Sequence, residues 1–355
     1  MRYLTSALGR LGLLLLALSL IGSCGTANPT SPPEQPATRI EPTHAPTPKP
    51  SPSQGEESRP QAGASSTEEA SGHSSSATGR GILAFSPDAR TRPTDGMVVL
   101  YVPGGSFQMG STESEVEDAI TLCTEHYTIC NRWYYMREYP QHPVSLAGYW
   151  LDQTEVTNEQ YRRCVEAGVC EEPAECKKGT PTYADPDKSD HPVVCVSWKD
   201  ARDYCHWAGA RMPTEAEWEY AARGEQGRIF PWGDLFDGAK LNYCDVNCTA
   251  THADSRYDDG FAGTSPVGSF PKGASWIGAL GMGGSVSEWV GDWLGEYTPE
   301  AESNPTGPSE GSEKLVKGGS WFFHPTYCRG AIRASIEPGT RIDFLGFRCA
   351  ASFGE

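Results

Sequence analysis

The sequence lacks a hydrophobic run long enough to cross a membrane as a helix. Its most apolar stretch lies at residues 11–21, whereas a spanning helix needs about 20 apolar residues. Positive charge is also scarce: 29 Lys and Arg residues stand against 46 Asp and Glu residues, which gives a formal net charge of −17. Because nucleic-acid binding depends on cationic contacts to phosphate, we expect no nucleic-acid partner.

Several chemical signatures are missing as well. The sequence has no Cys-x-x-Cys pair, no glycine-rich phosphate-binding loop and no recognisable Ser-His-Asp or nucleophile-elbow pattern. A structural zinc site, nucleotide binding and serine-type hydrolysis are therefore not indicated. The chain is instead rich in glycine, proline and tryptophan, with 39, 28 and 10 residues, and it contains 12 cysteines.

The N-terminus carries the pattern of an export signal. Arg2 and Arg10 flank a short n-region, the apolar run at 11–21 follows, and small residues lead into Cys24. Small residues before a cysteine are typical of a bacterial lipoprotein, so we predict a lipoprotein signal peptide at 1–23 and a lipid-modified Cys24. The alternative is an ordinary secretory signal with a chance cysteine. A lipid anchor would hold the protein in the cell envelope, on the periplasmic or outer-membrane face.

The chain then changes composition twice. Residues 24–92 are mostly Pro, Ser, Thr, Gly and Glu with few large apolar side chains. Such a segment cannot bury enough surface to offset its ordering entropy, so we predict a disordered tether. Residues 93–355 are long enough for one folded domain with its own core.

The cysteines predict a disulfide framework. Removing Cys24 from the 12 leaves eleven, and an odd number in an exported protein suggests five bridges and one free thiol. The local candidates are Cys123–Cys130 and Cys244–Cys248. Two further bridges would come from four cysteines whose pairing the sequence leaves open: Cys164, Cys170, Cys176 and Cys195.

Local patterns predict short strands and a few helices. Residues 97–111 read as two strands separated by a Pro-Gly-Gly turn, and residues 144–151 have strand-like apolar spacing. Thr157 and Thr214 each precede a helical pattern with Gln or Glu three positions later, which is the signature of a capping box. A further helix is expected to begin near Ser197.

Longer motifs occur in a characteristic order. Residues 191–224 contain two adjoining helical segments, residues 318–333 read GGSWFFHPTYCRGAIR, and GFRC follows at 346–349. Together they resemble the formylglycine-generating enzymes, or sulfatase-modifying-factor family, over essentially all of residues 93–355. The resemblance implies an α+β, C-type-lectin-like fold that is low in regular secondary structure, with small twisted antiparallel sheets and a few helices.

The same resemblance completes the cysteine assignment. It implies a bridge between Cys205 and Cys349, which would join the middle of the domain to its C-terminal strand. Closing so long a loop contributes roughly 4 kcal/mol to stability. Cys328 is then the thiol left without a partner.

Two calcium sites are typical of the family. The first set maps onto Asn242, Tyr243, Asp259 and Phe261, which offer a carboxylate and neutral oxygens of the kind that Ca²⁺ prefers. The alternative is that Asn242 and Asp259 serve only as turn residues. For the second site the resemblance implies a further set of ligands, namely Gly284, Val286 and Glu288. Glycine stands at 281, where an Asp or Asn is usual, so this second site is weakened and we expect one calcium ion.

Residues 318–333 are where the resemblance would place chemistry. In the family, two cysteines five positions apart hold Cu(I), and the copper activates O₂. Here Cys328 is present, but Phe323 stands five positions before it. A single thiolate is a poor holder for soft Cu(I), so copper is not expected. Ser320 and His324 are the other candidate catalytic residues, and a Cys328–His324 metal site or a nucleophilic, redox-sensing Cys328 are further alternatives.

Two functions remain open from the sequence. The first is a divergent, non-catalytic module that binds an exported polypeptide, a glycan or a partner protein at the membrane surface. The second is an active oxidase that converts a cysteine of exported sulfatase-like proteins to formylglycine with O₂. Phe323 and the weakened second calcium site favour the first, while Cys328 and the extent of the resemblance favour the second. We expect a monomer in either case.

Overall fold

The computed structural model describes residues 88–125, 127, 130–173 and 176–352. The predicted signal peptide, Cys24 and nearly all of the predicted tether lie outside these residues. Within the described ranges, none of the helices combines the length and apolar character that a membrane span requires.

Short elements dominate the domain. The strands are β1 (Ala89–Thr91), β2 (Val98–Val102), β3 (Gly105–Met109), β4 (His142–Leu146), β5 (Tyr149–Asp152), β6 (Ser287–Trp293), β7 (Glu302–Ser303), β8 (Lys314–Lys317), β9 (Ala334–Ile336), β10 (Leu345–Phe347) and β11 (Ala350–Ser352). The α-helices are α2 (Glu113–Thr124), α3 (Arg132–Tyr135), α4 (Asn158–Glu166), α5 (Trp198–Trp207) and α6 (Glu215–Arg223). The 3₁₀ helices are η1 (Met136–Glu138), η2 (Pro186–Lys188), η3 (Gly238–Lys240), η4 (Pro271–Gly273) and η5 (Pro325–Cys328).

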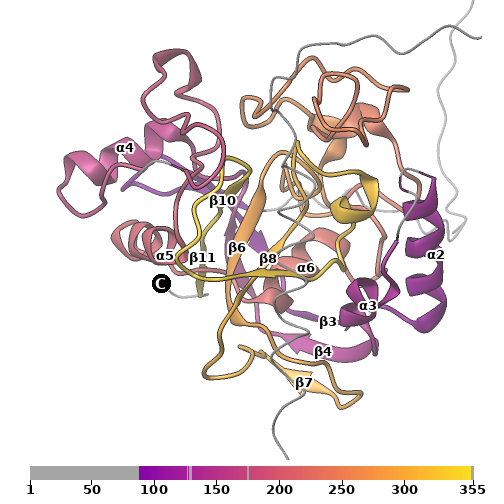
Figure 1. Cartoon of the computed structure of the whole chain (residues 1–355). Helices are drawn as coiled ribbons and strands as arrows, with labels where there is room; N and C mark the ends of the chain where they lie inside the picture. The colour runs from indigo at the N-terminus through magenta and orange to yellow at the C-terminus, as the bar shows by residue number, and fades with distance from the viewer. Residues whose placement is uncertain (1–87, 126, 128–129, 174–175, 353–355) are drawn as a thin grey trace, which may run out of the picture. The chain divides into compact units, whose positions relative to one another are not determined.

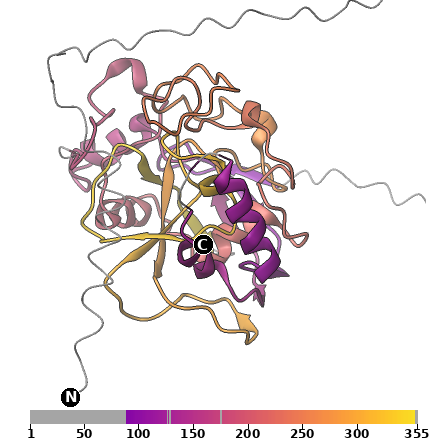
Figure 2. The ribbon, with the colours of Figure 1, turned by 45° about the vertical axis from the view of Figure 1, so that its right-hand side comes forward.

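The strands form three small sheets, in the orders β1-β2-β5-β11, β10-β6-β8-β9 and β3-β4-β7. The α+β prediction is confirmed. Most strand pairs are antiparallel, as expected, while β10 pairs with β6, and β7 with β4, in parallel. In both parallel pairs the two strands are far apart in the sequence, so short-range patterns do not reveal that they pair. In Figures 1 and 2, α4 and α5 lie on one side of β6 and β8, and α2 and α3 on the other.

Side-chain caps determine where the helices begin. The predicted capping boxes at Thr157 and Thr214 are confirmed, and Ser197 forms another at the start of α5. The prediction missed α2, although Thr112 and Glu115 form the same reciprocal hydrogen bonds there. That signal is visible in the sequence as Thr-x-x-Glu.

The N-terminal boundary of the domain lies earlier than predicted. Strand β1 pairs with β2, and Arg92 binds the buried carboxylates of Asp95 and Asp152. Residues 89–92 therefore belong to the sheet and its ion pairs rather than to the tether. They lack large apolar side chains, so their place in the sheet was not apparent from composition.

Among the residues that the structure describes, five disulfides connect the loops: Cys123–Cys130, Cys164–Cys170, Cys176–Cys195, Cys205–Cys349 and Cys244–Cys248. Cys205 lies on α5 and Cys349 between β10 and β11, so their bridge joins segments 144 positions apart in the chain. Cys328 is buried and carries no disulfide.

Candidate functional site

The loop at 318–333 follows β8 and lies against the start of β6. The Gly284 N–H donates to the Gly318 carbonyl over 2.7 Å, and the Trp321 N–H donates to the Ser285 carbonyl over 2.9 Å. The Ser287 hydroxyl donates to the Gly319 carbonyl over 2.9 Å. Backbone bonds of this kind fix the path of the loop whatever its side chains are.

Cys328 lies at the end of η5 and is fully buried. Burial raises the pKa of its thiol to about 12, outweighing a hydrogen bond from the Ser320 backbone that acts in the opposite direction. A Cβ at Gly319 would come within 2.8 Å of its sulfur, so the backbone covers the thiol closely. Burial and the raised pKa of Cys328 both argue against the low-pKa nucleophile considered from the sequence.

Phe323 belongs to a cluster of partly buried aromatic side chains. Its ring is stacked on Tyr327 at 4.9 Å and meets Phe344 at 5.2 Å. Phe322 is stacked on Phe344 at 5.5 Å, and Trp321 lies against Phe322 at 5.8 Å. The position of the second expected thiol therefore carries a packed hydrocarbon ring.

Ser320 and His324 are both buried and support the loop. The Ser320 hydroxyl accepts the Phe322 N–H over 3.2 Å. His324 caps η5, and its Nδ1 lies 2.8 Å from the Thr326 hydroxyl. Its ring meets the edge of Tyr127 at 4.2 Å. These contacts give Ser320 and His324 a structural role in the loop. They do not support the Cys328–His324 metal site.

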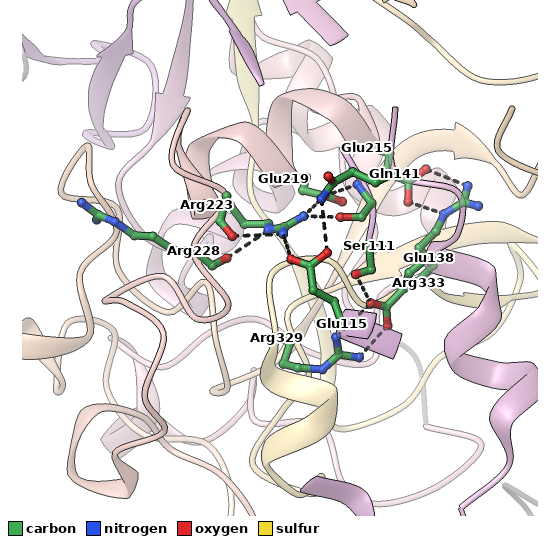
Figure 3. Close-up of polar contacts among 12 residues, drawn as sticks. Ser111, Glu115, Glu138, Gln141, Glu215, Glu219, Arg223, Arg228, Arg329 and Arg333 are labelled. Carbon is green, nitrogen blue, oxygen red and sulfur yellow. Dashed lines mark hydrogen bonds and ion pairs between the residues drawn. The ribbon is translucent and has the colours of Figure 1, made fainter. Parts of the chain in front are cut away.

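Buried ion pairs fix the loop at both ends and in its middle. Lys317 Nζ lies 3.0 Å from Glu219 Oε2, and Arg333 Nε lies 2.7 Å from Glu215 Oε1. Both glutamates belong to α6, and Arg329 pairs with Glu138 of η1. Figure 3 shows the contacts around Glu138, Glu215 and Glu219. The sequence prediction missed this network, because each pair joins residues that are far apart in the chain.

The first expected calcium set is brought together. The Asp259 carboxylate accepts the Tyr243 N–H over 3.3 Å and the Phe261 N–H over 2.8 Å. The Asn242 Nδ2 donates to the Gly263 carbonyl, but the Asn242 Oδ1 is buried with no hydrogen-bond partner.

The charges at this set also suit a cation. Burial raises the pKa of Asp259 to about 7, and the neighbouring carboxylate of Asp245, which accepts the Asp259 N–H, adds to that rise. Within the described ranges, no group of three or more His, Cys, Asp or Glu residues could hold a metal ion. A calcium site here would therefore depend on amide and carbonyl oxygens, and the free Asn242 oxygen fits that donor chemistry.

The second expected set does not fit calcium. Glu288 is buried, and its Oε2 accepts the Trp218 Nε1–H over 2.8 Å and the Arg348 Nε–H over 2.7 Å. Its Oε1 accepts the Arg348 Nη2–H over 2.7 Å. Gly284 and Val286 lie in the adjoining backbone. The only carboxylate of the set, that of Glu288, is already paired with Arg348.

Comparison with known proteins agrees with the fold described above. The family model described as "Sulfatase-modifying factor enzyme 1-like domain" matches residues 84–353. The chain belongs to this family. It is 30% identical to the formylglycine-generating enzyme of Bos taurus, with 94% of this chain and 87% of the bovine protein covered. Identity to the Mus musculus formylglycine-generating enzyme is 43%, over 46% of this chain and 45% of the mouse protein.

A solved structure shows the same fold. PvdO from Pseudomonas aeruginosa superposes with a TM-score of 0.58 at 27% identity, and the alignment covers 76% of this chain and 100% of that one. The sulfatase-modifying-factor fold predicted from the motifs is thus confirmed.

Proposed function

We propose that this family member is a membrane-anchored, catalytically divergent module that binds an exported polypeptide instead of oxidising it. The family contains enzymes whose names denote formylglycine formation, which makes a polypeptide the favoured ligand class. A glycan ligand is the other outcome that a binding test would reveal. The predicted lipid at Cys24 would place the domain at a membrane surface.

The relation between Cys328 and Phe323 carries this proposal. A copper oxidase of the type implied by the family needs paired thiolates, because Cu(I) is soft and prefers sulfur ligands. The 318–333 loop offers one thiol, that of Cys328, whose pKa is raised to about 12 by burial. Phe323 supplies a ring stacked on Tyr327 in place of a second sulfur. Neither residue can provide a thiolate at neutral pH without rearrangement of the loop.

The loop is suited to recognition because it is rigid and aromatic. Buried ion pairs fix its ends, as described above, and Trp321, Phe322 and Phe323 remain partly exposed. Aromatic side chains are enriched in binding interfaces because they bury a large area at low entropic cost.

A neighbouring loop supports the same aromatic residues. The Cys244 N–H donates to the Phe323 carbonyl over 3.0 Å, and His252 Nε2 lies 3.0 Å from the Phe322 carbonyl. Calcium held by Asn242, Asp259 and the carbonyls of Tyr243 and Phe261 would stabilise this supporting loop. The proposed role of calcium is therefore structural.

An oxidation assay tests the proposal directly. The purified chain is incubated with Cu(I), O₂ and a Cys-x-Pro-x-Arg peptide, and the mass of the peptide cysteine is followed. We expect the wild-type protein to leave the peptide unchanged. Turnover by the wild type that disappears in Cys328→Ala would overturn the non-catalytic assignment.

A gain-of-function variant and a binding measurement complete the test. Phe323→Cys should acquire Cu(I) binding that wild type lacks, while Phe322→Cys, one position away, should not. Binding of a labelled peptide by fluorescence anisotropy should weaken in Phe322→Ala. A protein that binds glycans but no peptide would contradict the assigned ligand class.

A further inference from the structure

A cavity of ligand size lies where β3, β4, β6 and α6 meet, and residues between 295 and 308 complete its wall. Its volume is about 300 Å³, at the lower end of the roughly 300–1,000 Å³ typical of small-molecule pockets. Arg333, at the end of the 318–333 loop, contributes to the wall, but Trp321, Phe322 and Phe323 do not. The cavity is therefore distinct from the aromatic cluster of that loop.

The walls of this cavity carry more negative than positive charge. Its acidic residues are Glu215, Asp292, Glu296 and Glu302, and its basic residues are His142 and Arg333. Arg333 is already paired with Glu215, to which it donates from Nε over 2.7 Å and from Nη2 over 2.9 Å. That pair is neutral overall, so the remaining three carboxylates outweigh any charge on the histidine.

Asp292 is a buried carboxylate of the wall that has no cation paired with it. The residue is 4% exposed, and its Oδ2 accepts the Glu215 N–H over 2.9 Å. Among the described residues, no group donates to its Oδ1. The neighbouring Lys314 donates instead to the Gly291 carbonyl over 2.6 Å and lies 3.9 Å from the centre of the Trp293 ring. Burial raises the pKa of Asp292 to about 7, and the charge of Glu215 adds to that rise. A cationic ligand would stabilise this carboxylate.

Negative charge lies at two depths of the cavity. Glu296 and Glu302 line it but are exposed, which places them at its entrance, whereas Asp292 is buried. The wall also includes Trp293 and Pro305, whose partly buried apolar surfaces suit a hydrocarbon chain. A ligand with two cationic groups on a short chain can therefore meet carboxylates at both depths, while a singly charged ligand meets only one.

The hydrogen bonding of Asp292 favours an ammonium group over a guanidinium group. A guanidinium binds a carboxylate best through two parallel hydrogen bonds, as Arg333 binds Glu215. One oxygen of Asp292 is already occupied by the Glu215 N–H, which leaves the other for a ligand. An ammonium is a compact charge with three rotatable donors, so a single free oxygen is enough to bind it.

We propose that this cavity binds a linear aliphatic diamine, with one ammonium group at Asp292 and the other at Glu296 and Glu302. The hydrocarbon chain of the ligand lies along the apolar part of the wall. A few charged groups on a partly apolar wall are the usual composition of a small-molecule site. The inference goes beyond the proposed function and does not depend on it, because the site uses neither the aromatic cluster nor the expected calcium ligands.

Isothermal titration calorimetry of the full chain at pH 8 tests the site with putrescine, butylamine and butyrate. Putrescine should bind most tightly, butylamine more weakly, and butyrate not at all. Asp292→Asn keeps an acceptor for the Glu215 N–H but removes the buried charge, so it should weaken putrescine binding about tenfold or more.

Variants at exposed positions test the entrance of the cavity. Glu302→Gln should weaken putrescine binding only about two- to fivefold, because exposed ion pairs contribute little, and it should leave butylamine binding unchanged. Glu310→Gln is the matched control, since Glu310 is also exposed but does not line the cavity, and it should bind putrescine as wild type does.

Two results would overturn the proposal. The first is a wild-type protein that binds neither amine, or that binds butyrate as well as butylamine. The second is an Asp292→Asn variant that folds and binds putrescine with wild-type affinity. If Asp292→Asn fails to fold, the double variant Glu296→Gln/Glu302→Gln carries the test, because both of its positions are exposed. It should lose the preference for putrescine over butylamine, and an unchanged preference would refute the site.

Discussion

Glu138 holds Arg329 by two parallel hydrogen bonds, from Nη1 to Oε2 over 2.9 Å and from Nη2 to Oε1 over 2.6 Å. The two residues are 191 positions apart, and neither is more than 5% exposed. Arg329 directly follows Cys328 in the sequence. Because its guanidinium pairs with Glu138, its positive charge lies at η1 and not at the thiol. The pair therefore stabilises the 318–333 loop without activating its cysteine.

Breaking this pair should destabilise the protein strongly. Glu138→Gln leaves the Arg329 charge buried without its partner, and we expect a loss of about 3–5 kcal/mol in the free energy of unfolding. The control is Glu117→Gln, which breaks an ion pair to Arg132 whose glutamate side chain is 54% exposed. That variant should lose less than about 1 kcal/mol. Equal losses in urea unfolding would contradict the assigned role of Glu138.

Calcium should stabilise the protein more at pH 8 than at pH 5. The folded pKa of Asp259 is raised to about 7, above the value of about 4 for an unfolded aspartate. The protonated carboxyl thus contributes stability that is fully present below pH 4 and is lost as pH rises through 7. Calcium binds the deprotonated carboxylate and restores stability above that pH.

Two variants separate the proton effect from the calcium effect. Asp259→Asn should reduce both the pH dependence and the calcium response of Tm. Asp292→Asn should reduce only the pH dependence, because burial raises the pKa of Asp292 to about 7 as well, at a place away from the calcium ligands. A calcium response in Asp259→Asn as strong at pH 8 as in wild type would argue against the first calcium set.

The Cys205–Cys349 bridge should contribute more to stability than Cys244–Cys248. The two loops differ in sequence separation, 144 against 4 positions. Loop-closure entropy predicts a loss of roughly 4–5 kcal/mol for the double serine variant of the long bridge and about 2 kcal/mol for that of the short one. Guanidinium unfolding of both variants provides the measurement. A larger loss for the short bridge would show that strain or residual structure outweighs chain entropy.

Local sequence was a good guide where the deciding contacts are local. The helix starts at Thr157 and Thr214 followed from side chains three positions apart, and the helix start at Thr112 carries the same pattern. The place of β1 in the sheet and the parallel pairing of β6 with β10 were not predictable in this way. Both depend on backbone hydrogen bonds between distant segments.

The sequence by itself determined the family, the helix caps and the presence of one cysteine where a two-thiol copper site needs two. These depend on residue identity and short spacing, which need no coordinates. Only the tertiary structure decided that Cys328 is covered, that Glu288 is committed to Arg348, and that Asp292 lines a cavity. Burial and charge pairing arise when distant segments meet, so they set the pKa and the metal-binding capacity of groups whose identity the sequence already shows.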